Sequence, residues 1–241
     1  MDLGTLSNEI YQRNSTTPAP AQHQPTPCLF EPYPGLSKTV SVHSLQIPEK
    51  AQNEFQKACN ALQARKLQET EQHLRKGLQI YPADASSWVM LGKVLEMDEH
   101  VEEAGEACSQ GAIHDPSYWA ADLCLAEIDG REHKWANSLA ESNLTMSLNP
   151  ESKRFADYFS AVALLNLDRV AEAETRALEA EQLDRDHQLP PLHLLIARID
   201  EAKGDSPDAM TQLRDFLKSA KDSPDADLAK KELTRLESEA Q

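Results

Sequence analysis

The sequence lacks the long apolar segments that membrane-spanning helices need. No apolar run approaches the ~18 residues of such a helix, and charged residues make up 27% of the chain. The N-terminus also lacks the basic and then apolar stretches of a signal peptide. We therefore expect no membrane insertion and take the cytoplasm as the default compartment.

Basic residues and catalytic motifs are scarce as well. The chain has 24 Lys and Arg against 40 Asp and Glu, a formal net charge of −16. Nucleic-acid binding needs clustered Lys and Arg, so nucleic acid is disfavoured as a partner. The eight glycines form no phosphate-binding loop. There is no HExxH or GxSxG motif, and the histidines lack the i, i+4 pairing of a metal site. We expect no enzyme, no metal and no cofactor.

The spacing of the four cysteines fits no metal-binding or redox motif. Cys28, Cys59, Cys108 and Cys124 form no CxxC pair and no ligand spacing. The last three lie in segments with helical periodicity, where a small, buried, reduced thiol is the ordinary role. The sequence therefore predicts no disulfide framework.

The clearest pattern that is present is a helical hairpin over residues 86–116. Trp88, Leu91, Gly92 and Leu95 follow the i, i+3, i+4, i+7 spacing of an amphipathic helix. A second stripe follows a short polar connection at 98–100 and is lined by Val101, Ala104, Cys108 and Ile113. Small residues at Gly92, Ala104 and Gly111 allow the two helices to approach closely. Pro116 ends the unit, because proline cannot continue a helix.

This hairpin recurs along the chain. Pro82, Pro116 and Pro150 are each 34 residues apart. A small residue of the second helix recurs at steps of 34, 34, 35 and 36, at Thr70, Ala104, Ser138, Ala173 and Ala209. This period and the motif Trp88-x-x-Leu91-Gly92, with Leu95, Ala104 and Pro116, resemble a tetratricopeptide repeat (TPR) protein of the bacterial type.

The resemblance implies an all-α, right-handed superhelical solenoid of about five helix-turn-helix hairpins plus a C-terminal capping helix. We assign 1–38 to a disordered Pro-rich tail, 39–48 to an extended leader, 49–221 to the repeat array and 222–241 to the capping helix. In the tail, Leu29, Phe30 and Tyr33 are apolar and could bind back onto the solenoid. In the capping helix, Leu228, Leu233 and Leu236 share one side.

In the TPR family the first helices of the hairpins line a concave groove that holds a peptide or a helix of a partner. Carried over repeat by repeat, the resemblance gives the groove candidates Val89, Lys93, Glu96, Leu123, Glu127, Tyr158, Val162, Leu165, Leu194, Arg198 and Glu201. The alternative role for Leu123, Val162 and Leu165 is packing between hairpins. Val89 and Leu123 do not fit the clamp that some family members use for chaperone C-termini, so a mixed apolar groove for an amphipathic or extended segment is expected.

Acidic residues concentrate in the second repeat. Residues 83–116 contain eight carboxylates against one basic residue, Lys93. An acidic patch of Glu99, Glu102, Glu103 and Glu106 could steer a basic partner. The alternative is that these side chains are simply solvated.

Two classes of function remain after these exclusions. The first is a non-catalytic scaffold or adaptor that binds other proteins, through a basic or amphipathic segment of the partner. The second is a self-associating structural subunit of a larger assembly. Repeat proteins of this kind also work in bacterial envelopes, so an envelope or periplasmic location is the alternative if the chain has lost an upstream segment.

Overall fold

The regular structure of the chain is helical throughout its described part. The computed structural model describes residue 33 and residues 46–185, 189–220, 222–223 and 225–239, and no strand occurs among them. The helices are α2 (Glu49–Gln63), α3 (Leu67–Ile80), α4 (Ala85–Met97), α5 (Val101–His114), α6 (Trp119–Arg131), α7 (Trp135–Leu148), the 3-10 helix η2 (Pro150–Ser152), α8 (Lys153–Asn166), α9 (Val170–Leu183), α10 (Pro191–Lys203), α11 (Ser206–Ser219) and α12 (Ala226–Glu239).

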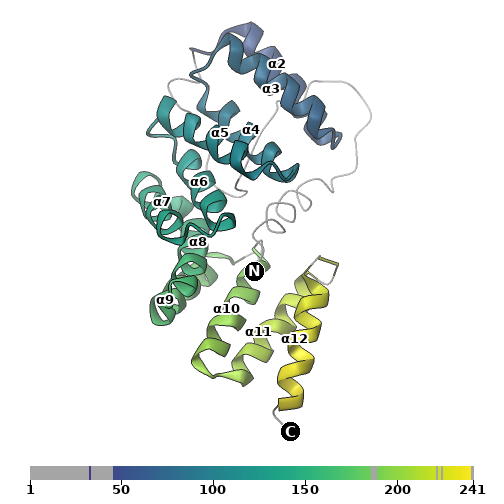
Figure 1. The fold of residues 1–241 in the computed structure, drawn as a ribbon, viewed down its shortest axis with the longest axis vertical. Helices are drawn as coiled ribbons and strands as arrows, with labels where there is room; N and C mark the ends of the chain where they lie inside the picture. Colours follow the sequence, from purple (N-terminus) through teal and green to yellow (C-terminus); the bar gives the residue numbers. More distant parts are fainter. Residues whose placement is uncertain (1–32, 34–45, 186–188, 221, 224, 240–241) are drawn as a thin grey trace.

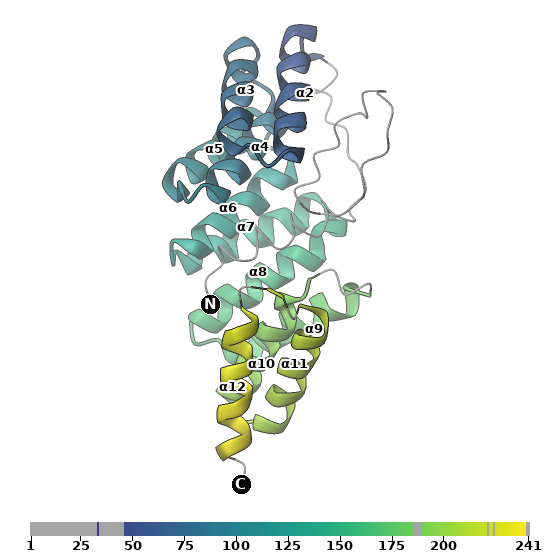
Figure 2. The same cartoon turned by 90° about the vertical axis from the view of Figure 1, so that its right-hand side faces the viewer.

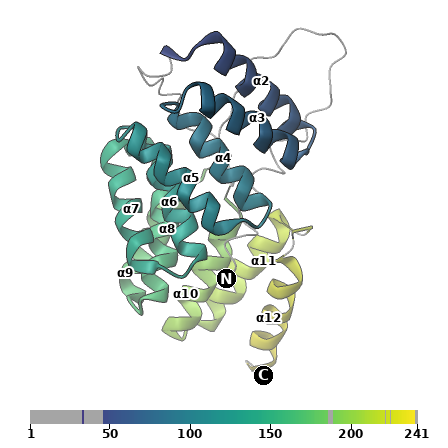
Figure 3. The same cartoon turned by 45° about the horizontal axis from the view of Figure 1, so that its top comes forward.

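These helices form five antiparallel hairpins and one further helix. Successive helices pair as α2 with α3, α4 with α5, α6 with α7, α8 with α9 and α10 with α11 (Figure 1). The second helix of each hairpin also packs against the first helix of the next, and α12 packs against α11. The array is therefore elongated, with α2 at one end and α12 at the other (Figures 2 and 3). The predicted all-α solenoid is confirmed.

Each hairpin turns in the same way. The first helix ends in a bond from a backbone N–H to the carbonyl five residues earlier, as His100 N to Leu95 O at 2.9 Å. The residue before this N–H has a positive φ, which lets the chain reverse at the helix end. These residues are Arg65, Glu99, His133, Asp168 and Gly204, so they follow the repeat period. Only the fifth hairpin uses glycine, the residue that adopts this conformation without steric cost.

The small residues that revealed the repeat lie where the helices cross. Thr70, Ala104, Ser138, Ala173 and Ala209 are all at most 2% exposed. Gly92 faces the same crossing from α4, and a Cβ atom there would lie 2.4 Å from the Cys108 sulfur and 3.1 Å from the Ala104 carbonyl oxygen. The sequence period therefore reflects the close approach of the two helices in every hairpin.

The first helices of the central hairpins are more buried than the second ones. Ten residues are buried in each of α4, α6 and α8, whereas α5 has four and α7 and α9 have three each. Figure 1 shows α4, α6 and α8 as one row and α5, α7 and α9 as another. We call the surface of α4, α6 and α8 away from α5, α7 and α9 the inner face. Ile113 at the end of α5 is 64% exposed, so its predicted place on the buried stripe is wrong.

The prediction of reduced cysteines is also wrong for the cysteines that the structure describes. A disulfide joins Cys108 of α5 to Cys124 of α6, with the two Cα atoms 5.9 Å apart. Cys59 is disulfide-bonded as well, and Cys28 lies outside the described residues. The physical reason is that α5 packs directly on α6, which places two sulfur atoms from different repeats side by side next to Gly92.

Candidate interaction site on the inner face

Most of the predicted groove residues lie on the inner row of helices and are buried. Those of α4, α6 and α8 that are at most 3% exposed are Val89, Lys93, Glu96, Leu123, Glu127, Tyr158 and Val162. Leu165 and Glu201 are half-buried, Leu194 is buried and Arg198 is exposed. The expected groove is therefore filled along the central hairpins and accessible in the last one.

A buried ion pair links the two central repeats. Lys93 and Glu127 are 34 residues apart, so they occupy equivalent positions on α4 and α6, and their Nζ and Oε2 atoms are 2.6 Å apart. The Lys93 amine also donates to Glu96 at 2.7 Å. Because equivalent positions of neighbouring repeats lie side by side, opposite charges there meet directly. The lysine thus neutralises carboxylates of two hairpins.

Arg131, at the end of α6, completes the charge balance. Its guanidinium lies 3.4 Å from the Glu96 carboxylate and donates to the Glu96 backbone carbonyl at 3.2 Å. It also donates to Glu99, in the turn after α4, at 3.1 Å. Lys93 and Arg131 together match the charges of Glu96 and Glu127. A buried network of this kind is tolerable because each charge has an opposite one within reach.

The protonation of Lys93 follows from this arrangement. Burial by itself disfavours the charged amine, but the negative charges of Glu127 and Glu96 outweigh that effect. The pKa of Lys93 consequently lies above its usual value. The lysine is therefore a cation throughout the physiological pH range, although only 2% of its side chain is exposed.

One side chain from outside the repeats sits on this network. The hydroxyl of Tyr33 donates a hydrogen bond to Glu127 Oε2 at 3.1 Å, and Tyr33 is only 3% exposed. Its ring centroid lies 6.0 Å from that of Trp119 and 5.4 Å from that of Phe155. The Lys93 ammonium lies 5.8 Å from the Tyr33 ring centroid, close enough for a cation–π contact. We call the group Lys93, Trp119, Glu127 and Phe155 the Tyr33 pocket.

The Tyr33 pocket draws on all three inner helices. Lys93 lies on α4, Trp119 and Glu127 on α6, and Phe155 on α8. Burial, and then the charge of Glu127, raises the pKa of Tyr33 well above its usual value. The tyrosine therefore remains a neutral phenol that can donate its proton to the carboxylate. The predicted binding of the tail back onto the repeats is confirmed for Tyr33, whereas Leu29 and Phe30 lie outside the described residues.

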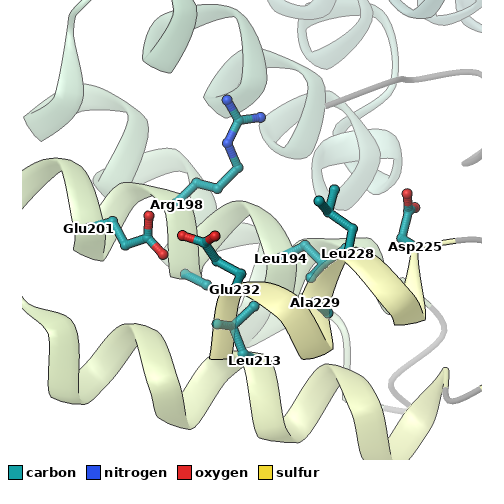
Figure 4. A pocket seen from close by; sticks show the side chains of 9 residues that line it. Leu194, Arg198, Glu201, Leu213, Asp225, Leu228, Ala229 and Glu232 are labelled. Carbon is teal, nitrogen blue, oxygen red and sulfur yellow. The ribbon is translucent and has the colours of Figure 1, made fainter. Parts of the chain in front are cut away.

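A cavity of about 280 Å³ lies at the other end of the predicted groove, between α10, α11 and α12. Its lining combines apolar and charged side chains. The apolar ones are Leu194, Ala197, Leu213, Leu228 and Ala229, and the charged ones are Arg198, Glu201, Asp225 and Glu232 (Figure 4). In this view the carboxylates of Glu201 and Glu232 face each other across the two helices. Three predicted groove residues, Leu194, Arg198 and Glu201, therefore meet in one accessible cavity.

Leu228, near the start of α12, lines this cavity and is exposed. It is 62% exposed, whereas Leu236 is 2% exposed and packs in the cluster of α10, α11 and α12. The side that the sequence predicts Leu228, Leu233 and Leu236 to share does not bring equal burial, because Leu228 lies at the open cavity.

The acidic patch is partly neutralised by basic side chains of other repeats. Glu99 pairs with Arg131, and Glu103 pairs with Arg75 of α3 at 2.9 Å. Glu102 and Glu106 are exposed. Two of the four carboxylates are thus engaged between hairpins.

Neither a metal site nor a membrane helix is found in the part of the chain that the structure describes. No group of three or more His, Cys, Asp and Glu side chains is placed to hold a metal ion there. None of the helices among those residues is long and apolar enough to cross a membrane.

Sequence reasoning did not single out several residues of this site. Trp119, Phe155 and Arg131 were not predicted, although each lies on an inner helix. Arg131 could have been found from its sequence separation of 32 residues from Glu99, which is close to the length of one repeat. Nothing in the periodicity marks Trp119 and Phe155, because their role depends on a tyrosine outside the repeats.

Comparison with known proteins gives matches in structure but not in sequence. No protein-family model and no curated protein matches the chain. Solved structures do match. They include a thermophilic TPR protein from Thermus thermophilus, with 15% identity, 76% of this chain and 99% of that chain covered, and a TM-score of 0.63.

Two further structures give the same result. The type IV pilus biogenesis factor PilW has 14% identity, 80% of this chain and 93% of that chain covered, and a TM-score of 0.65. MamA from Desulfovibrio magneticus has 14% identity, 73% of this chain and 99% of that chain covered, and a TM-score of 0.62. The chain therefore has the tetratricopeptide-repeat fold, as its sequence period predicts.

Proposed function

We propose that this protein is a non-catalytic scaffold or adaptor that holds a peptide or helix of a partner protein on the inner face of the solenoid. The observation that carries the proposal is Tyr33: a side chain from outside the repeats is buried there against three successive inner helices. A surface that receives one protein side chain in this way is suited to receive others. Binding alone is then the activity.

The chemistry of the inner face supports a protein partner. Aromatic walls from Trp119 and Phe155 supply apolar contact area, and the Lys93–Glu127 pair supplies fixed polar groups. Such a mixture, in which buried aromatic anchors provide affinity and polar groups provide orientation, is typical of protein-recognition surfaces. A partner with a basic or amphipathic segment also suits the net charge of −16.

The disulfide bears on the compartment. Disulfides persist in oxidising compartments and are rare in the reducing cytosol. The Cys108–Cys124 bond therefore favours an envelope or periplasmic location over the cytoplasmic default.

The proposal is tested with a matched pair of variants. A library of random displayed peptides is selected on the full chain carrying Tyr33→Ala, and the enriched peptides are then measured on Leu165→Arg and Leu178→Arg versions. Leu165 is a half-buried predicted groove residue on α8, whereas Leu178 is 40% exposed on α9 of the same hairpin. We expect Leu165→Arg to abolish binding of the peptides and Leu178→Arg to leave it unchanged. Enrichment of no peptide, or equal effects of both variants, contradicts the proposal.

Self-association is the second candidate function, and the exposed Leu228 favours it. Leu228 is exposed at the cavity between α10, α11 and α12, where contact with a second copy of the chain would bury it. This candidate predicts a molecular mass that rises with concentration in analytical ultracentrifugation and returns to that of one chain in Leu228→Ser. A mass that is independent of concentration rules it out.

A further inference from the structure

The Tyr33 pocket has a chemistry that fits one side chain in particular. Two aromatic rings flank the Tyr33 ring at tilted angles of 47° and 55°, a favourable arrangement for aromatic pairs. The Lys93 ammonium lies near the same ring. An aliphatic side chain of similar length would lose both kinds of contact. The walls therefore select an aromatic ring.

The end of the pocket selects a hydroxyl donor. Glu127 Oε2 receives the Tyr33 hydroxyl at 3.1 Å and the Lys93 amine at 2.6 Å. A phenylalanine in the place of Tyr33 would fill the aromatic walls but would remove one donor from a buried carboxylate. Removing a hydrogen bond from such a group is costly, because water cannot replace the lost partner. The pocket thus distinguishes tyrosine from phenylalanine.

The charges around the pocket disfavour an anionic ligand. Lys93 and Arg131 are already matched by Glu96 and Glu127. Arg154, whose guanidinium lies over the Phe155 ring, is paired with Asp184, so these three cations near the pocket already have a carboxylate partner. A phosphotyrosine carries about −1.5 to −2 charges and would be placed against the Glu127 carboxylate. The pocket therefore fits the neutral phenol and repels its phosphorylated form.

We propose that the inner face recognises a segment of a partner protein that presents an unmodified tyrosine, and that Tyr33 of the chain itself occupies this tyrosine site until the partner displaces it. This inference rests on the proposed function and names the anchor residue of the partner. The geometry that supports it is the burial of Tyr33 among residues of α4, α6 and α8, with its hydroxyl on Glu127.

Occupation by Tyr33 lowers the apparent affinity for any competitor. A ligand binds only the fraction of molecules in which the site is vacant, so its apparent Kd is its intrinsic Kd divided by that fraction. Tyr33→Ala removes the resident side chain and leaves the four pocket residues in place. Wild-type and Tyr33→Ala chains therefore form a matched pair that differs in access to the pocket.

The probe is a synthetic peptide with the sequence of residues 29–37, LFEPYPGLS, added to the full-length Tyr33→Ala protein. Binding is measured by calorimetry and by tryptophan fluorescence, since Trp119 belongs to the pocket. Two further peptides replace the central tyrosine by phenylalanine or by phosphotyrosine. Thermal unfolding of each protein checks that the variants are folded.

We expect saturable one-to-one binding of the tyrosine peptide to Tyr33→Ala. Binding to the wild-type chain should be at least about ten-fold weaker, if Tyr33 fills the site in nine molecules of ten. The phenylalanine peptide should bind about ten- to a hundred-fold more weakly than the tyrosine peptide, the range for a hydrogen bond to a charged group. The phosphotyrosine peptide should not bind.

Three outcomes overturn the inference. These are equal binding of the phenylalanine and tyrosine peptides, equal binding to wild-type and Tyr33→Ala proteins, and absence of binding in a folded Tyr33→Ala protein. The library selection described above separates this failure from that of the proposed function. Peptides that lack tyrosine but still depend on Leu165 would leave the scaffold function intact and refute only the tyrosine site.

Discussion

Tyr33 and Glu127 are joined by a buried hydrogen bond across 94 residues of sequence. Glu127 in turn is paired with Lys93 of the preceding repeat. One carboxylate therefore connects α4, α6 and a residue that belongs to neither.

The first prediction concerns the hydroxyl of Tyr33. Tyr33→Phe removes one donor from the Glu127 carboxylate and should lower the free energy of unfolding by about 1.5–3 kcal/mol, because hydrogen bonds to charged groups contribute about this much. Urea denaturation followed by circular dichroism measures the loss. The control is Tyr81→Phe at the end of α3, which should change stability by less than about 0.5 kcal/mol. Equal losses in both variants would contradict the role of the hydroxyl.

The second prediction concerns the buried ion pair. Lys93→Met leaves Glu96 and Glu127 facing each other with one cation fewer, and should destabilise the protein by about 3–5 kcal/mol. Adding Glu127→Gln should restore part of this loss, since it removes the uncompensated charge. Both variants are compared by urea denaturation.

The control for the ion pair lies on the surface. Lys66 and Glu69 form an i, i+3 pair at 2.8 Å, with side chains 61% and 48% exposed. Exposed pairs contribute little, so Lys66→Met should cost at most about 1 kcal/mol. If Lys93→Met costs no more than Lys66→Met, the buried network is not a stabilising feature of the inner face.

The third prediction concerns Gly92 and the disulfide. Alanine at this position would place its Cβ 2.4 Å from the Cys108 sulfur. Gly92→Ala should therefore destabilise the protein, although alanine is by about 1 kcal/mol the better helix former. In a Cys108→Ala background the obstructing sulfur is absent, so the same substitution should be less harmful. A double-mutant cycle with a coupling energy near zero would contradict this.

The disulfide itself should stabilise the fold. The two cysteines are separated by 16 residues in the sequence. A disulfide that closes a loop of this length stabilises the folded protein by about 3 kcal/mol. Thermal unfolding with and without a reducing agent measures the effect. A reducing agent also breaks the disulfide of Cys59. The double variant Cys108→Ala, Cys124→Ala lacks only the Cys108–Cys124 bond, so its change in Tm gives the contribution of that bond.

The fourth prediction concerns pH. Burial, and then the charge of Glu141, raises the pKa of Asp122 on α6 to about 6. An acid whose pKa is raised on folding favours the folded state while it is protonated. This contribution is complete below its usual pKa of 3.8 and is lost as the pH rises through about 6. Asp122→Asn should therefore raise Tm at pH 7.5 by a few degrees, ~2–4 °C per kcal/mol, and leave it unchanged near pH 4.

The control for this pH dependence is Asp227 on α12. Its side chain is 85% exposed, and its pKa is lowered by a hydrogen bond from Lys230. Asp227→Asn should not raise Tm at either pH. A rise in Tm at pH 7.5 that is the same for both variants would show that net charge, and not the burial of Asp122, is responsible.

The sequence predicted the architecture because the fold repeats one local rule. The period of the small residues Thr70, Ala104, Ser138, Ala173 and Ala209 is the period of the helix crossings, where only small side chains fit. The same rule could have identified the Lys93–Glu127 pair, since residues one repeat apart lie side by side on neighbouring helices. The assignment of residues 1–38, 39–48, 49–221 and 222–241 as separate domains stays a prediction.

The parts that sequence reasoning missed do not follow the period. Cys108 and Cys124 belong to different repeats at non-equivalent positions, so no motif announces their bond. The contact of Tyr33 with the repeats was predicted, but its exact place was not, because that place depends on the particular side chains of Trp119, Phe155 and Glu127. Val89, Leu123 and Tyr158 belong to the core formed by packed repeats, and periodicity alone does not separate such core positions from groove positions.

The Cys108–Cys124 bond has a mechanical consequence. When an array of hairpins is pulled from its two ends, each hairpin can unravel and release its length in turn. The covalent bond prevents the segment between the two cysteines from extending, which withholds about 50 Å at ~3.3–3.6 Å per residue. This segment joins the second hairpin to the third and contains Trp119 of the Tyr33 pocket. The chain therefore cannot extend completely there. Under tension, the oxidised protein would keep the loop between Cys108 and Cys124 closed, whereas the reduced protein would extend it.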